Sequence, residues 1–185
     1  MKKILLIFIL SLIVISNVMA ADEVKYTMIG KNKLYEIREY SDRLVIETET
    51  SDQSSGFKKL FKYISGDNKD KKEIKMTTPV TQTEKNGNMT MQFYMPAEFN
   101  ESNIPDPNNS EVKVLNIKGG YYAAIIYSGR ASDSNYSKHK DILEDQLKKD
   151  KISIISKPIR ATYNSPFTLP MLRRNEVIFK IEKNT

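Results

Sequence analysis

The chain has 185 residues, no cysteine, a single histidine and a formal net charge of +6 at neutral pH. The lack of cysteine excludes disulfides, a thiolate nucleophile and a cysteine-ligated metal, and one histidine cannot form a metal site built from several histidines. A charge of this size keeps a protein soluble without indicating a nucleic-acid partner, and aromatic and basic residues are not interleaved as in RNA-binding proteins.

Residues 1–20 have the order of a secretory signal peptide. Two lysines precede the apolar run Ile4–Ile15, and the small-x-small pattern Val18-Met19-Ala20 follows. The alternative is a membrane anchor, but the apolar run breaks at Ser16, short of the about 20 residues that a spanning helix needs. We therefore expect cleavage after Ala20 or Ala21, which lowers the net charge to +4. The cleaved protein is then exported to the periplasm or the outside of the cell, with no membrane span.

The next part of the chain predicts two strands and a helix. Residues 35–40 and 44–50 alternate with a period of two, which is typical of half-buried strands. Residues 53–65 change to a helical period. Their apolar side chains stand at positions i, i+3, i+4 and i+7, namely Phe57, Leu60, Phe61 and Ile64.

Two further strands are predicted after this helix. The runs Ile74–Val80 and Met89–Met95 alternate, and Asn86-Gly87 between them is a strong hairpin signal. Pro79 has no N–H to donate, so its strand should lie at an edge or be bulged there.

The same order of elements follows a Pro/Asn-rich connector at residues 100–110. Two strands are expected at 112–117 and 121–127, and the second is apolar on both faces and therefore buried on both. A helix is expected at 133–149, and strands at about 154–163 and 176–181.

The fold class that these elements predict is α+β. Strand, strand, helix, strand, strand occurs twice, over pseudo-repeats 34–99 and 111–183. Two such units can share one core. We predict a duplicated β-β-α-β-β unit that forms a distorted, mostly antiparallel barrel-like sheet of about eight strands, flanked by two helices. One domain then covers 34–185, with an N-terminal extension at 21–33.

Four segments of the sequence resemble a known family. They are YEIREY at 35–40, FKKLFKYISG at 57–66, IKMTTPV at 74–80 and YNSPFTLPMLRRNEV at 163–177. In order and spacing they are similar to the SOUL haem-binding family, over roughly residues 26–183. The resemblance implies a duplicated fold akin to bacterial effector-binding domains, with a hydrophobic groove for haem or another tetrapyrrole.

The resemblance also implies roles for individual residues. Phe57 and Phe61 match the helix face near the haem ring, and Lys62 matches a basic position proposed to meet a propionate. Arg173 and Arg174 match the family's Arg pair before the last strand.

Two positions depart from the family pattern. Glu39 stands where one member type has a histidine proposed as a haem ligand, and Leu169 stands nearest to a second propionate-binding lysine. We therefore expect weak or no axial ligation.

Each candidate residue also has a structural interpretation. The apolar stripe of the first helix is typical of a face that packs in the core. Lys62 can equally be a solvated side chain beside this stripe. His139 is better explained as a half-buried residue than as a haem ligand. Soft thioethers can bind metal, but they also fill irregular cores, which is the interpretation favoured for the methionines of the sheet. These are Met76, Met89, Met91 and Met95.

The function that the sequence favours is binding rather than catalysis. It contains no G-x-S-x-G elbow, H-E-x-x-H or P-loop. We expect a monomeric exported protein that holds haem or a related tetrapyrrole through apolar contacts and rim cations. The alternatives are a module for another amphipathic small molecule and a protein–protein interaction module.

Overall fold

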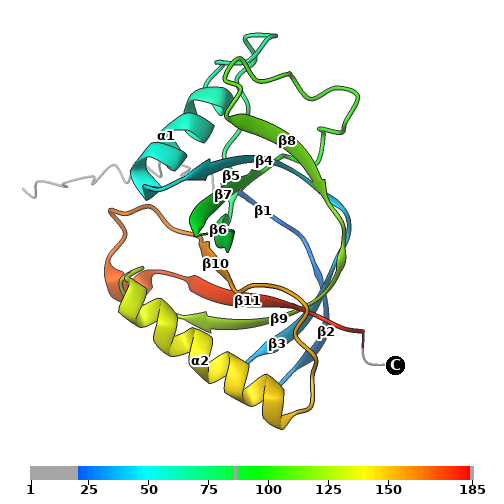
Figure 1. The fold of residues 1–185 in the computed structure, drawn as a ribbon, viewed down its shortest axis with the longest axis vertical. Helices are drawn as coiled ribbons and strands as arrows, with labels where there is room; N and C mark the ends of the chain where they lie inside the picture. The colour runs from blue at the N-terminus through cyan, green and yellow to red at the C-terminus, as the bar shows by residue number, and fades with distance from the viewer. Residues whose placement is uncertain (1–20, 86, 184–185) are drawn as a thin grey trace, which may run out of the picture.

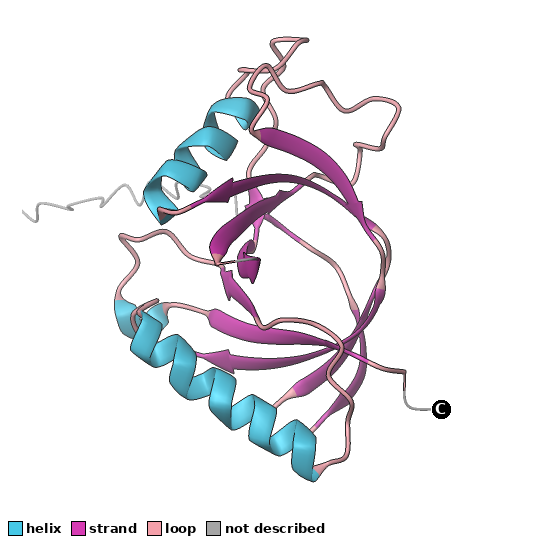
Figure 2. Ribbon diagram, viewed as in Figure 1, coloured by secondary structure: helices cyan, strands magenta, loops and turns pink. Residues whose placement is uncertain are grey.

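The computed structural model describes residues 21–85 and 87–183, so the predicted signal peptide lies outside the described residues. It has two α-helices on one large curved sheet (Figures 1 and 2). The helices are α1 (Gln53–Ile64) and α2 (Asp133–Lys149), and η1 (Pro170–Leu172) is a short 3-10 helix. The strands are β1 (Asp22–Glu23), β2 (Thr27–Lys31), β3 (Glu36–Tyr40), β4 (Arg43–Thr50), β5 (Thr77–Thr78), β6 (Val80–Lys85), β7 (Asn88–Tyr94), β8 (Val112–Ile117), β9 (Gly120–Tyr127), β10 (Ile159–Thr162) and β11 (Asn175–Ile181).

The order of strands in the large sheet confirms the predicted duplication. The order is β2-β3-β9-β11-β10-β6-β7-β4-β8, and its paired strands are antiparallel. The strands β3, β4, β6 and β7 of the first unit correspond to β8, β9, β10 and β11 of the second. If each strand is exchanged with its counterpart, the order from β3 to β8 becomes the same order read in the opposite direction. Each unit also gives its first strand to the other unit's half of the sheet. The two halves meet where β6 pairs with β10.

Helix α1 forms because its first turn is capped and one face is apolar. Asp52 accepts a hydrogen bond from the Ser55 N–H at 2.7 Å, which satisfies one of the free donors of the first turn. The buried face packs on β4 and β7 through Leu60 and Ile64. Gly56 permits the close approach, since a Cβ there would lie 2.7 Å from the side chain of Thr50.

Helix α2 covers the other half of the sheet. Ser132 caps it by accepting a hydrogen bond from Asn135 N–H. Leu143 and Leu147 are fully buried against Val177 and Phe179 of β11, which alternate with side chains on the opposite face. In the described part of the chain, all three hydrophobic clusters consist of residues between 24 and 181.

The structure differs from the sequence predictions in three segments of the chain. Residues 21–33, for which only an N-terminal extension was expected, contain β2, which pairs with β3, and β1, which pairs with β5. The strand predicted over 74–80 begins only at Thr77 and breaks at Pro79, which cannot donate to a ladder. The strand predicted over 154–163 is confined to β10, and Ile154 makes only an isolated bridge to Ile181.

The predicted burial of 121–127 holds for the centre of β9. Tyr122, Ala123, Ala124 and Ile125 are buried, whereas Ile126 is exposed.

Among residues 21–85 and 87–183, no helix combines the length and apolar character needed to cross a membrane.

Candidate functional site

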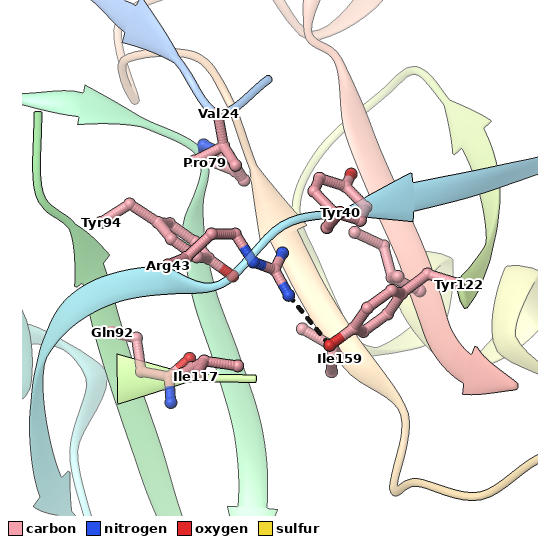
Figure 3. A pocket seen from close by; sticks show the side chains of 10 residues that line it. Val24, Tyr40, Arg43, Pro79, Gln92, Tyr94, Ile117, Tyr122 and Ile159 are labelled. Carbon is pink, nitrogen blue, oxygen red and sulfur yellow. Dashed lines mark hydrogen bonds between the residues drawn. The ribbon is translucent and has the colours of Figure 1, made fainter. Parts of the chain in front are cut away.

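The concave interior of the sheet is filled by its own side chains. Arg43 lies among the rings of Tyr40, Tyr94 and Tyr122, and its Nη2 donates a hydrogen bond to the Tyr122 hydroxyl at 2.9 Å (Figure 3). A space of only about 40 Å³ remains beside it. Such a space holds a water molecule but no flat organic ligand.

A buried ion-pair network fills the rest of this interior. Arg38 and Glu176 are both fully buried, and Arg38 donates to the Glu176 carboxylate at 2.7 and 3.0 Å. Arg38 also donates to Glu36, at 2.7 and 3.0 Å. Glu176 accepts further hydrogen bonds from Arg174 and from the hydroxyl of Tyr163.

The charges of this network shift one another's pKa values. Burial alone would lower the pKa of Arg38, but its hydrogen bonds to Glu176 and the charge of that carboxylate outweigh burial and raise it. Burial would raise the pKa of Glu36, but hydrogen bonds from Arg38 and Lys31 lower it. Both residues are therefore charged at neutral pH, and the network occupies the interior as a stable structural unit.

A much larger cavity, of about 630 Å³, lies on the outer, helix-bearing face of the sheet. We call it the outer cavity. It lies over the β6–β10 seam, between the first turn of α1 and the segment that leads into α2. Its lining residues are Ala21, Gln53, Ser54, Phe57, Met76, Thr78, Val80, Gln82, Met91, Ala131, Thr162, Tyr163, Asn164, Ser165, Pro166, Arg173 and Asn175.

Two polar side chains of the outer cavity have groups left to face a ligand, Arg173 and Gln82. Arg173 donates from Nε to the Thr168 carbonyl at 2.7 Å and from Nη2 to the Pro166 carbonyl at 2.5 Å. Its Nη1 makes no hydrogen bond to the described residues and can face a ligand. Gln82 is only 6% exposed, and its Nε2 has no hydrogen-bond partner in the described part of the chain.

The two predicted phenylalanines form an exposed aromatic flank of α1. Phe57 and Phe61 are 40% and 48% exposed, and their rings stack at 5.8 Å between centroids. Phe57 also meets Phe93 edge to face at 5.2 Å. Phe57 lines the outer cavity, whereas Phe61 extends the same surface beyond it. The apolar stripe is therefore divided, since Leu60 and Ile64 pack in the core and the phenylalanines do not.

The three predicted cations do not converge. Arg173 lines the outer cavity. Arg174 points to the interior, where it bonds Glu176 and forms an ion pair with Glu23 at 2.9 Å. Lys62 is exposed on α1 outside the lining and makes no ion pair with the described residues.

His139 and the methionines occupy structural positions. The His139 ring stacks on Tyr127 at 4.1 Å, and its Nδ1 is 2.8 Å from the Asn135 carbonyl oxygen, so it does not line the outer cavity. Met91 is fully buried in the core beneath α1, and Met76, Met89 and Met95 pack against this cluster. Met76 and Met91 also form part of the cavity lining. Within the described ranges, no group of three or more His, Cys, Asp or Glu side chains is placed to hold a metal ion.

No sequence pattern indicated that Gln82, Thr162 or residues 164–166 would line the cavity. A single glutamine in a strand has no distinctive spacing. The YNSP stretch was recognised as a family motif, but nothing in its composition indicated that it would cover the seam between two strands that are distant in sequence.

Comparison with known proteins places the sequence in a family and the fold among solved structures. The SOUL heme-binding protein family matches residues 21–180. The chain is 31% identical to heme-binding protein 2 of Homo sapiens over 164 residues, which is 81% of this chain and 78% of that protein. The Mus musculus protein of the same name is 30% identical over the same shares. In structure, the C-terminal domain of EcmrR is similar with a TM-score of 0.61 and 14% identity, over 86% of this chain and 99% of that domain.

Proposed function

The chain belongs to the SOUL heme-binding protein family, and on that premise we propose that it is an exported protein that holds haem or a related tetrapyrrole in the outer cavity. The role is binding, by apolar contact and a rim cation, rather than catalysis. The proposed export depends on the signal-peptide pattern of residues 1–20, and a mature N-terminus at Ala21 or Asp22 in the secreted protein would support it.

The observation that carries the proposal is the outer cavity itself. Its volume of about 630 Å³ falls within the roughly 300–1,000 Å³ of small-molecule sites. Phe57, Met76 and Val80 give it an apolar wall, and Arg173 gives it a cation at one end. This combination suits a flat apolar ring with carboxylate substituents.

The two helices add to the attraction for carboxylates. Gln53 and Ser54 of the first turn of α1 line the cavity, as does Ala131, just before the Ser132 cap of α2. Because a helix N-terminus carries a partial positive charge, both helices favour an anionic group there. A propionate beside Arg173 would be stabilised chiefly by its guanidinium.

Axial ligation by this cavity should be weak or absent. Among the described lining residues, the groups that are known as haem ligands are the thioethers of Met76 and Met91 and the phenol of Tyr163. Met91 packs in the core, and the Tyr163 hydroxyl already donates to Glu176 at 2.8 Å. When bound, haem would supply its own iron chemistry, and these residues would hold and orient the ring.

The test is a haemin titration of residues 21–185, followed by Soret absorbance. We expect a saturable one-to-one shift that Arg173→Glu weakens by about tenfold or more, because it replaces the cation by a carboxylate beside a propionate. Lys138→Glu, on the exposed face of α2, is the matched charge-reversal control and should leave the affinity unchanged. Lys62→Glu should weaken binding if the ring extends along α1 beyond Phe57.

A second candidate is another amphipathic small molecule in the same cavity. It is favoured by Glu39 and Leu169, which replace a histidine and a lysine of the family, and by the lack of histidine in the cavity lining. A Soret response no larger than that of a non-binding control protein would exclude haem and leave this candidate.

A further inference from the structure

The loop that follows the outer cavity exposes four large apolar side chains within six residues. Phe167 is 95% exposed, and Leu169, Met171 and Leu172 are 60–68% exposed. Contiguous exposed apolar groups of this kind mark interaction sites. We call residues 164–172 the apolar loop.

Hydrogen bonds hold the apolar loop in this conformation. Arg173 bonds the carbonyl groups of Thr168 and Pro166, and the Gly129 N–H donates to the Pro170 carbonyl at 2.8 Å. The Leu172 N–H donates to the Leu169 carbonyl and closes η1. The side chains are therefore presented by an ordered backbone, which reduces the entropy cost of docking.

The three segments that line the outer cavity around its helix starts, one of which contains the apolar loop, are basic. Residues 53–65, 126–132 and 163–175 together contain six lysines and arginines and no acidic residue. Elsewhere in 21–185, acidic residues slightly outnumber basic ones. Two of the six cations form ion pairs with carboxylates, whereas the other four have no ion pair with any described residue: Lys58, Lys62, Arg130 and Arg173.

The nearest acidic residues at the helix starts are already engaged. Asp52 caps α1, and Asp133 forms an ion pair with Arg160 at 2.7 Å. An exposed apolar loop with unpaired cations around it therefore faces outward at the mouth of the outer cavity.

We propose that the apolar loop is a membrane-docking element that inserts into the surface of an anionic lipid bilayer. Phe167, Met171 and Leu172 enter the boundary between headgroups and acyl chains, while Lys58 and Arg130 meet lipid phosphates. This places the mouth of the outer cavity at the bilayer, where amphipathic molecules are concentrated. The docking itself does not depend on which ligand the cavity takes.

The size of the apolar loop favours a bilayer over a protein partner. Four side chains offer roughly a few hundred Å² of apolar surface, below the about 800 Å² that each partner contributes to a standard protein interface. Insertion of a few apolar side chains together with electrostatic attraction is sufficient for a peripheral membrane contact. The surrounding charge also matches an anionic surface.

The test is flotation of residues 21–185 with vesicles of equimolar phosphatidylcholine and phosphatidylglycerol, compared with phosphatidylcholine alone. We expect binding to the anionic vesicles that falls as salt is raised. Replacement of Phe167, Met171 and Leu172 by serine together should weaken partition by about a hundredfold, since each removes an inserted apolar group. Lys58→Gln and Arg130→Gln should each weaken it about fivefold.

Ile155→Ser is the matched control, because Ile155 is 51% exposed on the segment between α2 and β10, outside the three basic segments. Its binding should equal that of the unaltered protein. Equal flotation of the triple-serine variant, or no flotation of the unaltered protein, would overturn the proposal. So would a concentration-dependent dimer that the triple-serine variant abolishes without any vesicle binding, because a second copy would then cover the loop.

Discussion

Removing one member of the buried ion-pair network should cost far more stability than removing a surface pair. In Glu176→Gln, both Arg38 and Arg174 lose a charged acceptor inside the sheet. Loss of one partner of a buried pair typically costs about 3–5 kcal/mol when the remaining charge is left uncompensated. Because Arg38 keeps Glu36 and Arg174 keeps Glu23, we expect the lower end of this range, about 3 kcal/mol, for Glu176→Gln. Arg38→Met should cost less, about 2–3 kcal/mol, because Glu176 keeps Arg174 and Tyr163.

The double variant Arg38→Met/Glu176→Gln tests whether Arg38 and Glu176 are energetically coupled, by comparing its loss of unfolding free energy with the sum of the two single losses. In it Glu36 keeps Lys31 at 3.0 Å and Arg174 keeps Glu23, so neither is left alone. We expect its loss of unfolding free energy to be at least about 1 kcal/mol smaller than the sum of the two single losses.

Urea denaturation of residues 21–185, followed by circular dichroism, gives the free energy of unfolding of each variant. Lys59→Gln is the control, because its ion pair with Glu111 is at the surface and should contribute no more than about 1 kcal/mol. If the two single losses add within about 0.5 kcal/mol in the double variant, the residues are not energetically coupled and the reasoning is wrong.

Three further outcomes are expected. His139→Ala should leave the haem spectrum nearly unchanged, because the imidazole lies outside the cavity lining; loss of a six-coordinate spectrum would make it a ligand. Burial raises the pKa of Tyr63 to about 12, and burial also raises that of Tyr40 to about 12 despite the opposing charge of Arg38. Their folded pKa values exceed the unfolded value near 10, so this stability is complete below pH 10 and is lost as pH rises towards 12; tyrosinate absorbance that rises fully at pH 10 without unfolding would contradict it. Gly119→Ala should lower the melting temperature, because a Cβ there would collide with the Tyr40 carbonyl oxygen and the backbone of Ser41; an unchanged value would show that the turn can move.

Hydrophobic periodicity predicted the helices and most strands, because their burial follows regular spacing. β4, α1, β9 and α2 lie within one or two residues of the predicted bounds. β2 was missed because four of its five residues are exposed, so it has no alternation of apolar and polar positions to detect. It is ordered by pairing with β3, a contact between residues that the sequence pattern does not bring together.

The candidate site could be predicted only in part, because residues of the same type point their side chains in different directions. Arg173 and Arg174 are identical neighbours, but successive side chains of an extended segment point to opposite faces. Arg173 therefore lines the outer cavity, whereas Arg174 joins Glu176 in the interior. The apolar stripe of α1 is divided for a related reason. The sheet covers Leu60 and Ile64 on one side of the helix and leaves Phe57 and Phe61 exposed on the other.

The duplication explains why the cavity lies where it does. The pseudo-twofold arrangement brings the starts of α1 and α2 to the same side of the molecule (Figure 1). The outer cavity lies between them, whereas the space beside Arg43 in the charged interior measures only about 40 Å³. The two units contribute differently to the cavity. The first supplies the apolar wall with Phe57, and the second supplies Arg173 and the covering 162–166 segment. Because the wall and the cation come from different units, neither unit could form this site alone. Variation at Ser165, Pro166 and Arg173, which line the cavity without bonding Glu176, can change the ligand without altering the shared core.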